Sequence, residues 1–258
     1  MAELFIKQAA SYAATRPGYP PELFRFIASK TPHHDLAWDV GTGNGQAAVP
    51  LASFYKDVVA TDTSPTQLAH AQRLPNIRYQ QTPESVTLDE LTRLVAPMCS
   101  VDLVTVAQAM HWFDLPTFYQ QVKHVLKRPG GVLAAWCYTE PCVSDTVDAV
   151  FWRLYKNSAP YWAPARKIVD DEYRSIEFPF EVVDGEEHTG PFTFKATKHM
   201  DLETYLAYIR SWSSYQTAHE QGIELLPEEV VKDFESAWGG NEVKPVQYPV
   251  HLRIGRVM

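Results

Sequence analysis

A glycine-rich turn constrains the fold of this chain more than any other feature. The short apolar run at 36–40 ends in the sequence Gly41-Thr42-Gly43-Asn44-Gly45. Glycines let the backbone reverse sharply and bring bare N–H groups against a ligand, and the N-terminus of a following helix adds donors and partial positive charge. Such a turn between a strand and a helix is typical of nucleotide-binding α/β folds, although glycine-rich turns also close many ordinary loops.

The spacing of these glycines indicates the kind of nucleotide. A dinucleotide fingerprint reads G-x-G-x-x-G, whereas here the third glycine arrives one residue early and Gln46 stands where the last glycine belongs. A nicotinamide cofactor is therefore disfavoured. A second apolar run, 57–61, ends at Asp62, whose carboxylate can accept both hydroxyls of a ribose. The turn and the acid together predict a ligand of the adenosine type.

The first half of the chain alternates short apolar strands with helical stretches. The predicted strands are 36–40, 57–61, 77–80, 101–106 and 131–136. This alternation predicts an α/β fold with a doubly wound, mostly parallel sheet. Ligands bind outside the carboxyl ends of the strands in such sheets. The residues expected at those ends are Gly41, Asp62, Glu84 and Gln108.

The remaining segments do not alternate strands and helices regularly. Helical spacing or capping residues predict helices at 2–14, 22–29, 144–157, 162–176 and 201–212. Alternating apolar and polar residues predict strands at 191–199 and 246–257.

Composition excludes several classes of function. A chain of 258 residues that is 45% hydrophobic can bury one large core. Its net charge of −8 and the absence of any run of basic residues argue against a nucleic-acid partner. Three cysteines without C-x-x-C spacing suggest neither a disulfide framework nor a metal site, and a reduced cytoplasm is expected. No apolar run approaches the ~18 residues of a membrane span.

Besides the glycine turn, four other recognisable motifs are spread along almost the whole chain. They read YAATRPGYP at 12–20, SVDLVTVAQAMHWFD at 100–114, LKRPGGVL at 126–133 and SWSSY at 211–215. With the glycine turn, they resemble class I S-adenosylmethionine-dependent methyltransferases of the type 11 or trans-aconitate methyltransferase-like group, which has plant and fungal members. The resemblance implies a Rossmann-like seven-stranded sheet with a helical cap, S-adenosyl-L-methionine as the cofactor and a small-molecule acceptor.

The same resemblance implies a plan for the chain. A single methyltransferase domain spans 1–258, with N-terminal helices over the donor site at 1–30 and a donor-binding core at 31–137. A cap or substrate region follows at 138–240 and includes an edge strand near 190–199, and the C-terminal strand lies at 241–258.

The expected contacts to the methyl donor come from five segments of the sequence. They are Tyr12, Arg16, Asp39, Gly41, Thr42, Gly43, Gly45, Asp62, Thr63, Thr82, Pro83, Glu84, Ala107 and Gln108. Three of these residues have an alternative role. Asp39 either holds the donor's amino group indirectly or only caps the turn. Glu84 either lies beside adenine or opens the next helix, and Arg16 either clamps the donor carboxylate or is a solvated arginine.

Methyl transfer from a sulfonium is an in-line displacement, so the enzyme must hold the acceptor about 3 Å from the methyl group in a dry, aligned arrangement. His111 follows the fourth strand, where the resemblance places the acceptor, and either donates to a carboxylate, acts as a base or packs beside Trp112. The expected acceptor-binding residues are Tyr19, His111, Trp112, Trp136, Tyr138, Trp212 and Tyr215. Trp152, Tyr205 and Trp238 are expected in the core instead.

The function that these features favour is O-methylation of a small carboxylate, which is already ionised at pH 7 and needs positioning more than a base. One alternative is methylation of nitrogen or a phenol, with His111 as the base. Another is a donor-binding module without catalysis, and a nicotinamide dehydrogenase is disfavoured by Gln46. No nucleic-acid or membrane partner is expected, and the protein should be a monomer or homodimer.

Overall fold

The computed structural model of the chain describes residues 16–258. The chain forms two compact units. The first, the sheet unit, comprises residues 19–139, 168–194 and 250–258. The second, the helical unit, comprises residues 16–18, 140–167 and 195–249. The predicted helix at 2–14 lies outside the described residues.

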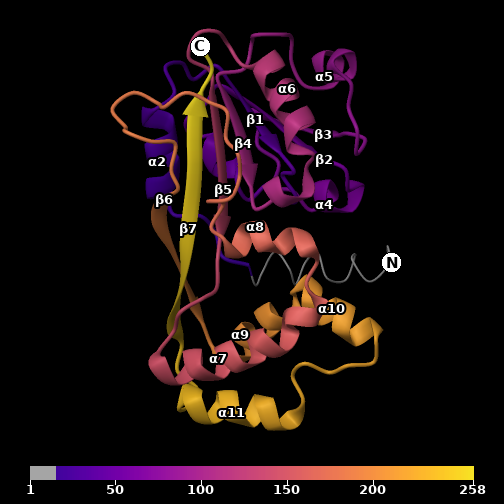
Figure 1. Cartoon of the computed structure of the whole chain (residues 1–258), viewed down its shortest axis with the longest axis vertical. Helices are drawn as coiled ribbons and strands as arrows, with labels where there is room; N and C mark the ends of the chain where they lie inside the picture. The colour runs from indigo at the N-terminus through magenta and orange to yellow at the C-terminus, as the bar shows by residue number, and fades with distance from the viewer. Residues whose placement is uncertain (1–15) are drawn as a thin grey trace. The chain divides into compact units, whose positions relative to one another are not determined.

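One seven-stranded sheet, ordered β3-β2-β1-β4-β5-β7-β6, organises the fold (Figure 1). Its strands are β1 Leu36–Val40, β2 Asp57–Asp62, β3 Ile77–Gln81, β4 Leu103–Ala107, β5 Val132–Tyr138, β6 Phe192–Met200 and β7 Lys244–Arg256. The first five strands pair in parallel, and β7 pairs with β5 in antiparallel orientation. The predicted seven-stranded, mostly parallel, Rossmann-like sheet is confirmed.

The central strands are apolar because both of their faces are covered. All seven residues of β5 are buried, as are the first four of β4. Runs of this kind, rich in valine, leucine and alanine, are typical of parallel strands packed on both sides. In the parallel register, Val40 lies opposite both Thr61 and Val106. The carboxyl ends of β1, β2 and β4 therefore meet at one edge of the sheet.

The helices of the sheet unit are short and amphipathic. They are α2 Pro21–Ser29, α3 Ala48–Leu51, α4 Pro65–Ala69, α5 Leu88–Leu94, the 3-10 helix η1 Met110–Trp112 and α6 Leu115–Val125. In α2, a proline at the first position supports the helix start, and Leu23, Phe24 and Ile27 form the buried face. Such a stripe of apolar side chains holds a helix onto a sheet.

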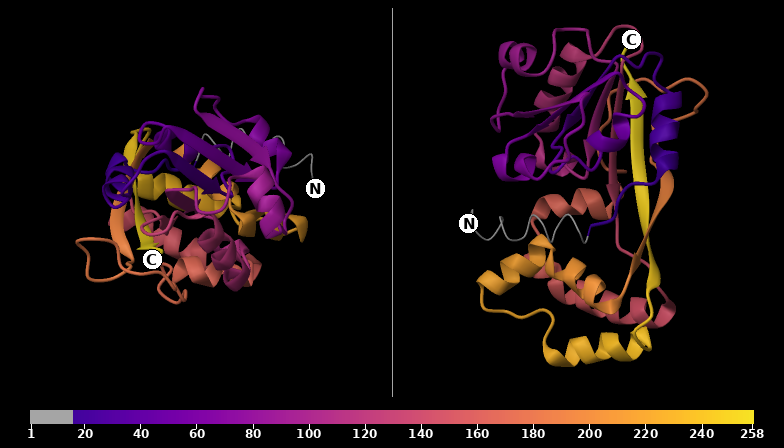
Figure 2. Two further views of the ribbon diagram at one scale, coloured as in Figure 1. Left: turned by 90° about the horizontal axis from the view of Figure 1, so that it is seen from above. Right: turned by 180° about the vertical axis from the view of Figure 1, so that it is seen from behind.

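Within residues 16–258, the helical unit contains four α-helices and two 3-10 turns. They are α7 Asp145–Ser158, η2 Ala159–Tyr161, η3 Pro164–Arg166, α9 Leu202–Arg210, α10 Ser213–Glu220 and α11 Glu228–Trp238. Helices α7 and α11 pack against each other (Figure 2). The side chain of Asp201 accepts a hydrogen bond of 2.8 Å from the Thr204 amide, as expected of a residue that caps α9.

Two sequence predictions are wrong in this region. The helix predicted at 162–176 is reduced to η3 and to α8, Lys167–Asp170. Glu172 and Tyr173 end it with φ angles of 56° and 61°, and the Arg253 guanidinium of β7 donates a bond of 2.9 Å to the Tyr173 carbonyl. Trp152 is 51% exposed rather than in the core, because the neighbouring Phe151 is buried and the next helical position turns by about 100°.

Tyr205 and Trp238 lie in the core as expected, with 0% and 2% of their surface exposed. Among residues 16–258, no helix combines the length and the apolar character that crossing a membrane requires.

Candidate functional site

The glycine turn after β1 lies against the loop that follows β4. Gly41 has a φ angle of 66°, and a Cβ added to it would come 2.8 Å from the Cβ of Ala109. Only glycine allows both that backbone conformation and that close approach. The turn predicted to hold the donor and the loop that carries His111 are therefore neighbours within the sheet unit.

The other two glycines of the turn have different surroundings. A Cβ added to Gly45 would lie 2.3 Å from the hydroxyl oxygen of Tyr79, which donates to the carbonyl of Gln72 at 3.0 Å. Gly43, with a φ of 57°, would place a Cβ no closer than 4.0 Å to any neighbour. The backbone of Gly43 therefore faces open space where another residue would have a side chain. This is the property needed to admit the polar end of a nucleoside ligand.

Asp62 ties the turn to the end of β2. One of its carboxylate oxygens accepts from the Gly43 amide and the other from the Ser64 amide, both at 2.8 Å. A carboxylate offers about four lone pairs, so these two bonds leave capacity for two ribose hydroxyls. The contact of Asp62 with ribose stays a prediction, and the geometry is compatible with it. Thr63, the adjacent predicted donor contact, is exposed.

Asp39 is fully buried beneath the turn. Its two oxygens accept from the hydroxyls of Thr42 at 2.5 Å and Thr105 at 2.7 Å. Loss of hydration raises the pKa of Asp39 to about 6, and the two hydroxyl donors only partly oppose this effect. The negative charge of Asp62 is a smaller contribution to the same rise. Asp39 therefore ties the Thr42 side chain of the turn to β4, and both of its predicted roles, capping the turn and holding the donor's amino group indirectly, stay predictions.

The helix that follows the turn, as expected, is short. Helix α3 has four residues and contains Pro50, which lacks a backbone donor. The Val49 amide reaches back to the Gly45 carbonyl at 3.0 Å. A single helical turn sums few peptide dipoles, so the partial positive charge that α3 adds at the glycine turn is smaller than expected. The backbone donors of the turn itself are the groups available for a ligand.

Gln108 joins the end of β4 to the end of β5. Its backbone has a φ of 57° and its amide donates to the Trp136 carbonyl at 2.8 Å. Its side chain accepts from the Tyr138 amide at 2.8 Å and donates to the Tyr138 carbonyl at 3.2 Å. The Gln108 side chain thus continues the hydrogen bonding between β4 and β5 one residue beyond the end of β4. Its role, and that of Ala107, toward the donor stay predictions.

His111 lies on η1 and is partly buried. Its ring centroid lies 4.7 Å from that of Trp112, which is 62% exposed. Phe113, the next residue, stacks on Phe118 at 4.7 Å and anchors the loop to α6. The loop therefore presents a histidine and an exposed indole at the carboxyl end of β4. Whether His111 touches an acceptor stays a prediction.

The segment after β3 is mostly exposed. The Thr82 amide donates to the Asp62 carbonyl at 3.0 Å, and Pro83 and Glu84 are exposed. Helix α5 begins only at Leu88, where Thr87 forms a capping box. The alternative in which Glu84 opens this helix is therefore wrong, and its contact with adenine stays a prediction.

The remaining predicted acceptor residues fall into two groups. In the sheet unit, Tyr19 packs edge-on against Trp136 at 5.4 Å, and both Trp136 and Tyr138 are buried. In the helical unit, Trp212 is 3% exposed, and the Tyr215 hydroxyl donates to Glu224 at 2.7 Å. The acceptor-binding role of all five residues stays a prediction. Trp136 is 0% exposed, so its ring surface is covered by protein.

Arg16 belongs to the helical unit. Its guanidinium donates to the Ser211 carbonyl at 3.0 Å and lies 5.5 Å from the centre of the Tyr208 ring. A clamp on the donor carboxylate stays a prediction for this residue. Tyr12, the other predicted contact near the N-terminus, lies outside the described residues.

Sequence reasoning missed two partners of the site, Thr105 and Tyr79. Thr105 lies opposite Asp39 in the β1–β4 register, so two polar side chains face each other inside apolar strands. A threonine in the run LVTVA and an aspartate in LAWDV are visible in the sequence, and such polar interruptions of buried strands are signals that could have identified the pair.

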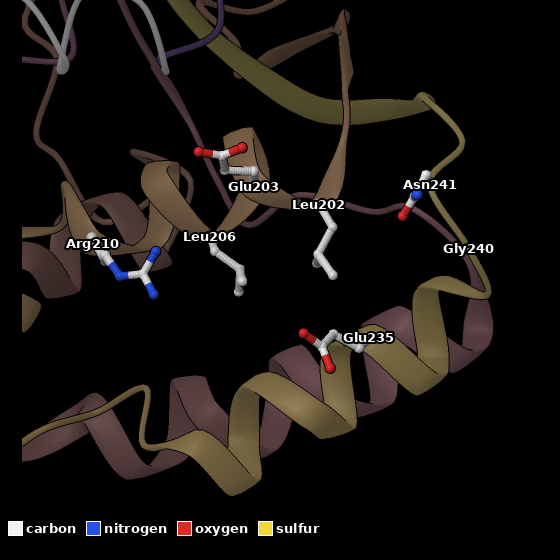
Figure 3. A pocket seen from close by; sticks show the side chains of 7 residues that line it. All are labelled: Leu202, Glu203, Leu206, Arg210, Glu235, Gly240 and Asn241. Atoms are coloured by element: carbon white, nitrogen blue, oxygen red, sulfur yellow. The ribbon is translucent and has the colours of Figure 1, made fainter.

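A pocket of about 540 Å³ lies in the helical unit, between α9 and α11 (Figure 3). Leu202 and Leu206 point into it, and charged side chains border it (Figure 3). None of the predicted site residues in the described part of the chain lines it. Within residues 16–258, no cluster of three His, Cys, Asp or Glu side chains is arranged to hold a metal ion.

Comparison with known proteins places this arrangement in a family. Residues 38–135 match the methyltransferase domain family. A Dictyostelium discoideum protein named as a methyltransferase is 34% identical over 255 residues, which cover 95% of this chain and 92% of that protein. A methyltransferase of Aspergillus terreus is 25% identical over 218 residues, covering 74% of this chain and 63% of its own.

A solved structure points to the same family. It is named as that of a type II methyltransferase from Anaeromyxobacter dehalogenans, is 34% identical and superposes with a TM-score of 0.81. The match covers 94% of this chain and 98% of the other. With the glycine turn, the acid at the end of β2 and the sheet order already described, these similarities show that the chain belongs to the class I S-adenosylmethionine-dependent methyltransferases.

Proposed function

We propose that this enzyme methylates a carboxylate oxygen of a small organic acid. The observation that supports this most directly is the contact between the glycine turn and the loop after β4, at Gly41 and Ala109. Two residues beyond Ala109, the loop carries His111. A reaction between a donor held at the turn and an acceptor held by the loop needs this proximity.

The residues of the turn fit the donor. Asp62 has lone pairs for the ribose hydroxyls, and the open backbone at Gly43 leaves room for the ligand. S-Adenosylmethionine, when bound, supplies an electrophilic methyl group on a positively charged sulfur. The protein's part is to hold both reactants, align them and exclude water.

A carboxylate acceptor suits an enzyme that only positions the two reactants. It is ionised near neutral pH and needs no base to become a nucleophile. The His111 imidazole then donates a hydrogen bond that orients the acid, and the exposed Trp112 ring offers it an apolar surface. If the acceptor were a phenol or an amine, His111 would have to remove a proton instead.

The chemistry of the product tests this proposal. Purified enzyme is incubated with S-adenosylmethionine and a panel of small acids, phenols and amines, and release of S-adenosylhomocysteine identifies the acceptor. The product is then treated with dilute alkali, which cleaves methyl esters but leaves aryl methyl ethers and N-methyl groups intact. An alkali-labile product supports carboxylate methylation. An alkali-stable product refutes it and favours the phenol or amine alternative.

A further inference from the structure

The pocket between α9 and α11 has an apolar wall on its α9 side. Leu202, Leu206 and Arg210 follow one another at spacings of four residues, which places them on one face of the helix. The two leucines point toward α11 (Figure 3), and Leu206 is only 5% exposed. The volume of about 540 Å³ lies within the range of about 300–1,000 Å³ that is typical of small-molecule sites. The pocket can therefore hold a small organic ligand and offers it an apolar surface.

Two carboxylates border the same pocket. Glu235 points from α11 toward α9, and Glu203 follows Leu202 on α9 (Figure 3). Among the described residues of the helical unit, the ion pairs are Arg153–Asp233, Arg166–Glu140 and Lys232–Glu228. Neither pocket acid takes part in an ion pair within this part of the chain. The pocket therefore carries negative charge that no described basic side chain neutralises by direct contact.

The end of α11 adds to this negative charge. The last four residues of the helix read ESAW, from Glu235 to Trp238, and include no basic side chain. Gly239 then ends the helix with a φ of 76°. The last carbonyls of a helix carry a partial negative charge that favours a nearby cation. Glu235 is an acid in this position, so a cation bound beside it would relieve the repulsion between its carboxylate and the end of the helix.

A basic residue, Arg210, lines the pocket at the end opposite Asn241 (Figure 3). The helical rise separates Arg210 from Leu202 by about 12 Å along α9. Burial and the neighbouring Glu224 raise the pKa of Tyr215 to about 12, whereas Arg210 lowers it, so Arg210 lies close to this phenol. The Tyr215 hydroxyl itself donates to Glu224 at 2.7 Å. Repulsion from Arg210 favours the end of the pocket away from it for a bound cation, where Asn241 offers an amide oxygen as an acceptor.

We propose that the pocket between α9 and α11 binds a primary alkylamine, with its ammonium group on Glu235 and its hydrocarbon chain along Leu202 and Leu206. An ammonium group has three donors and no acceptor, which matches a pocket end that offers carboxylate and amide oxygens. The hydrocarbon chain removes water from the two leucines. This site lies within the helical unit, and none of the predicted donor and acceptor residues in the described chain lines it. The inference therefore goes beyond the proposed function and does not depend on it.

Binding is measured by NMR on the full chain with carbon-13 in the leucine methyl groups. Leu202→Met and Leu206→Met assign the two pocket signals. The probe is n-hexylammonium, with hexan-1-ol as its neutral match, hexanoate as its anionic match and methylammonium as the head group alone. We expect n-hexylammonium to shift both signals in a saturable way and to bind more tightly than hexan-1-ol. Hexanoate and methylammonium should bind more weakly than n-hexylammonium, because the first has the wrong charge and the second has no chain.

Glu235→Gln should weaken binding of n-hexylammonium about two- to fivefold, the effect of one exposed ion pair, and leave hexan-1-ol unchanged. Glu229→Gln is the matched control, because it removes the same charge from the first turn of the same helix, outside the pocket. It should bind every probe like the parent. Thermal unfolding of both variants checks that they are folded.

Three results would overturn the proposal. The first is that hexan-1-ol or hexanoate binds as tightly as n-hexylammonium. The second is that Glu235→Gln and Glu229→Gln have equal effects, which would mean that only the overall negative charge attracts the amine. The third is that n-hexylammonium leaves the signals of Leu202 and Leu206 unmoved. None of these measurements uses a methyl donor or acceptor, so the outcome is separate from that of the product test.

Discussion

Replacing Asp39 with asparagine should change how the stability of the protein depends on pH. The buried carboxyl has a pKa raised from 3.8 to about 6, mainly by loss of hydration. Between these two values the folded protein keeps a proton that the unfolded chain has released. The free energy of unfolding therefore falls as the pH rises through this window. The difference of about 2.2 pH units (6 − 3.8) corresponds to about 3 kcal/mol over the whole window.

An asparagine at position 39 has nearly the same shape but does not titrate. Relative to the Asp39→Asn variant, the parent should lose about 1.4 kcal/mol of stability between about pH 5 and pH 7.5, the part of the window that is accessible without acid unfolding. Urea unfolding of both proteins, followed by tryptophan fluorescence across this range, measures the difference.

Asp201→Asn provides a control of opposite sign. The Asp201 carboxylate is exposed, and its hydrogen bonds with Thr204 lower its pKa. The stability that it contributes is present above the unfolded pKa and is lost as the pH falls through the folded pKa. If the parent and Asp39→Asn show parallel pH dependence, burial does not hold a proton on Asp39 and the reasoning is wrong.

Three further substitutions test the site. Asp62→Ala should weaken binding of S-adenosylhomocysteine at least tenfold, by about 1.5–3 kcal/mol. If calorimetry shows that the variant binds as tightly as the parent, Asp62 does not contact the ribose. The parent itself should not bind NAD. With a carboxylate acceptor, His111→Gln should keep part of the turnover and leave it nearly flat from about pH 7 to 9, whereas loss of a base would cost about 10²–10⁴-fold. Gly45→Ala should destabilise the fold by about 1–3 kcal/mol, because its Cβ would meet the Tyr79 hydroxyl at 2.3 Å. Adding Tyr79→Phe should recover part of that loss in urea unfolding, and strictly additive effects would contradict the clash.

The elements that could be predicted from sequence are those whose cause is local. Strands such as β1 and β4 follow from apolar runs because burial on both faces demands such runs. The end of the predicted helix at 162–176 has a distant cause, since Arg253, about 80 residues further along, holds the carbonyl of Tyr173. The site divides in the same way. The glycines and Asp62 are visible as a motif, whereas the pairing of Asp39 with Thr105 depends on strand register.

The side chain of Gln108 has a mechanical consequence for the enzyme. Its two bonds to the Tyr138 backbone make the tip of β5 and the loop after β4 move together. A displacement of the Tyr138 backbone would therefore act on Gln108, which lies three residues before His111 in the chain. Asparagine is one methylene too short to span this gap, and glutamate cannot donate to the carbonyl. Replacing Gln108 should therefore change the position of the loop that carries His111 without disturbing the core.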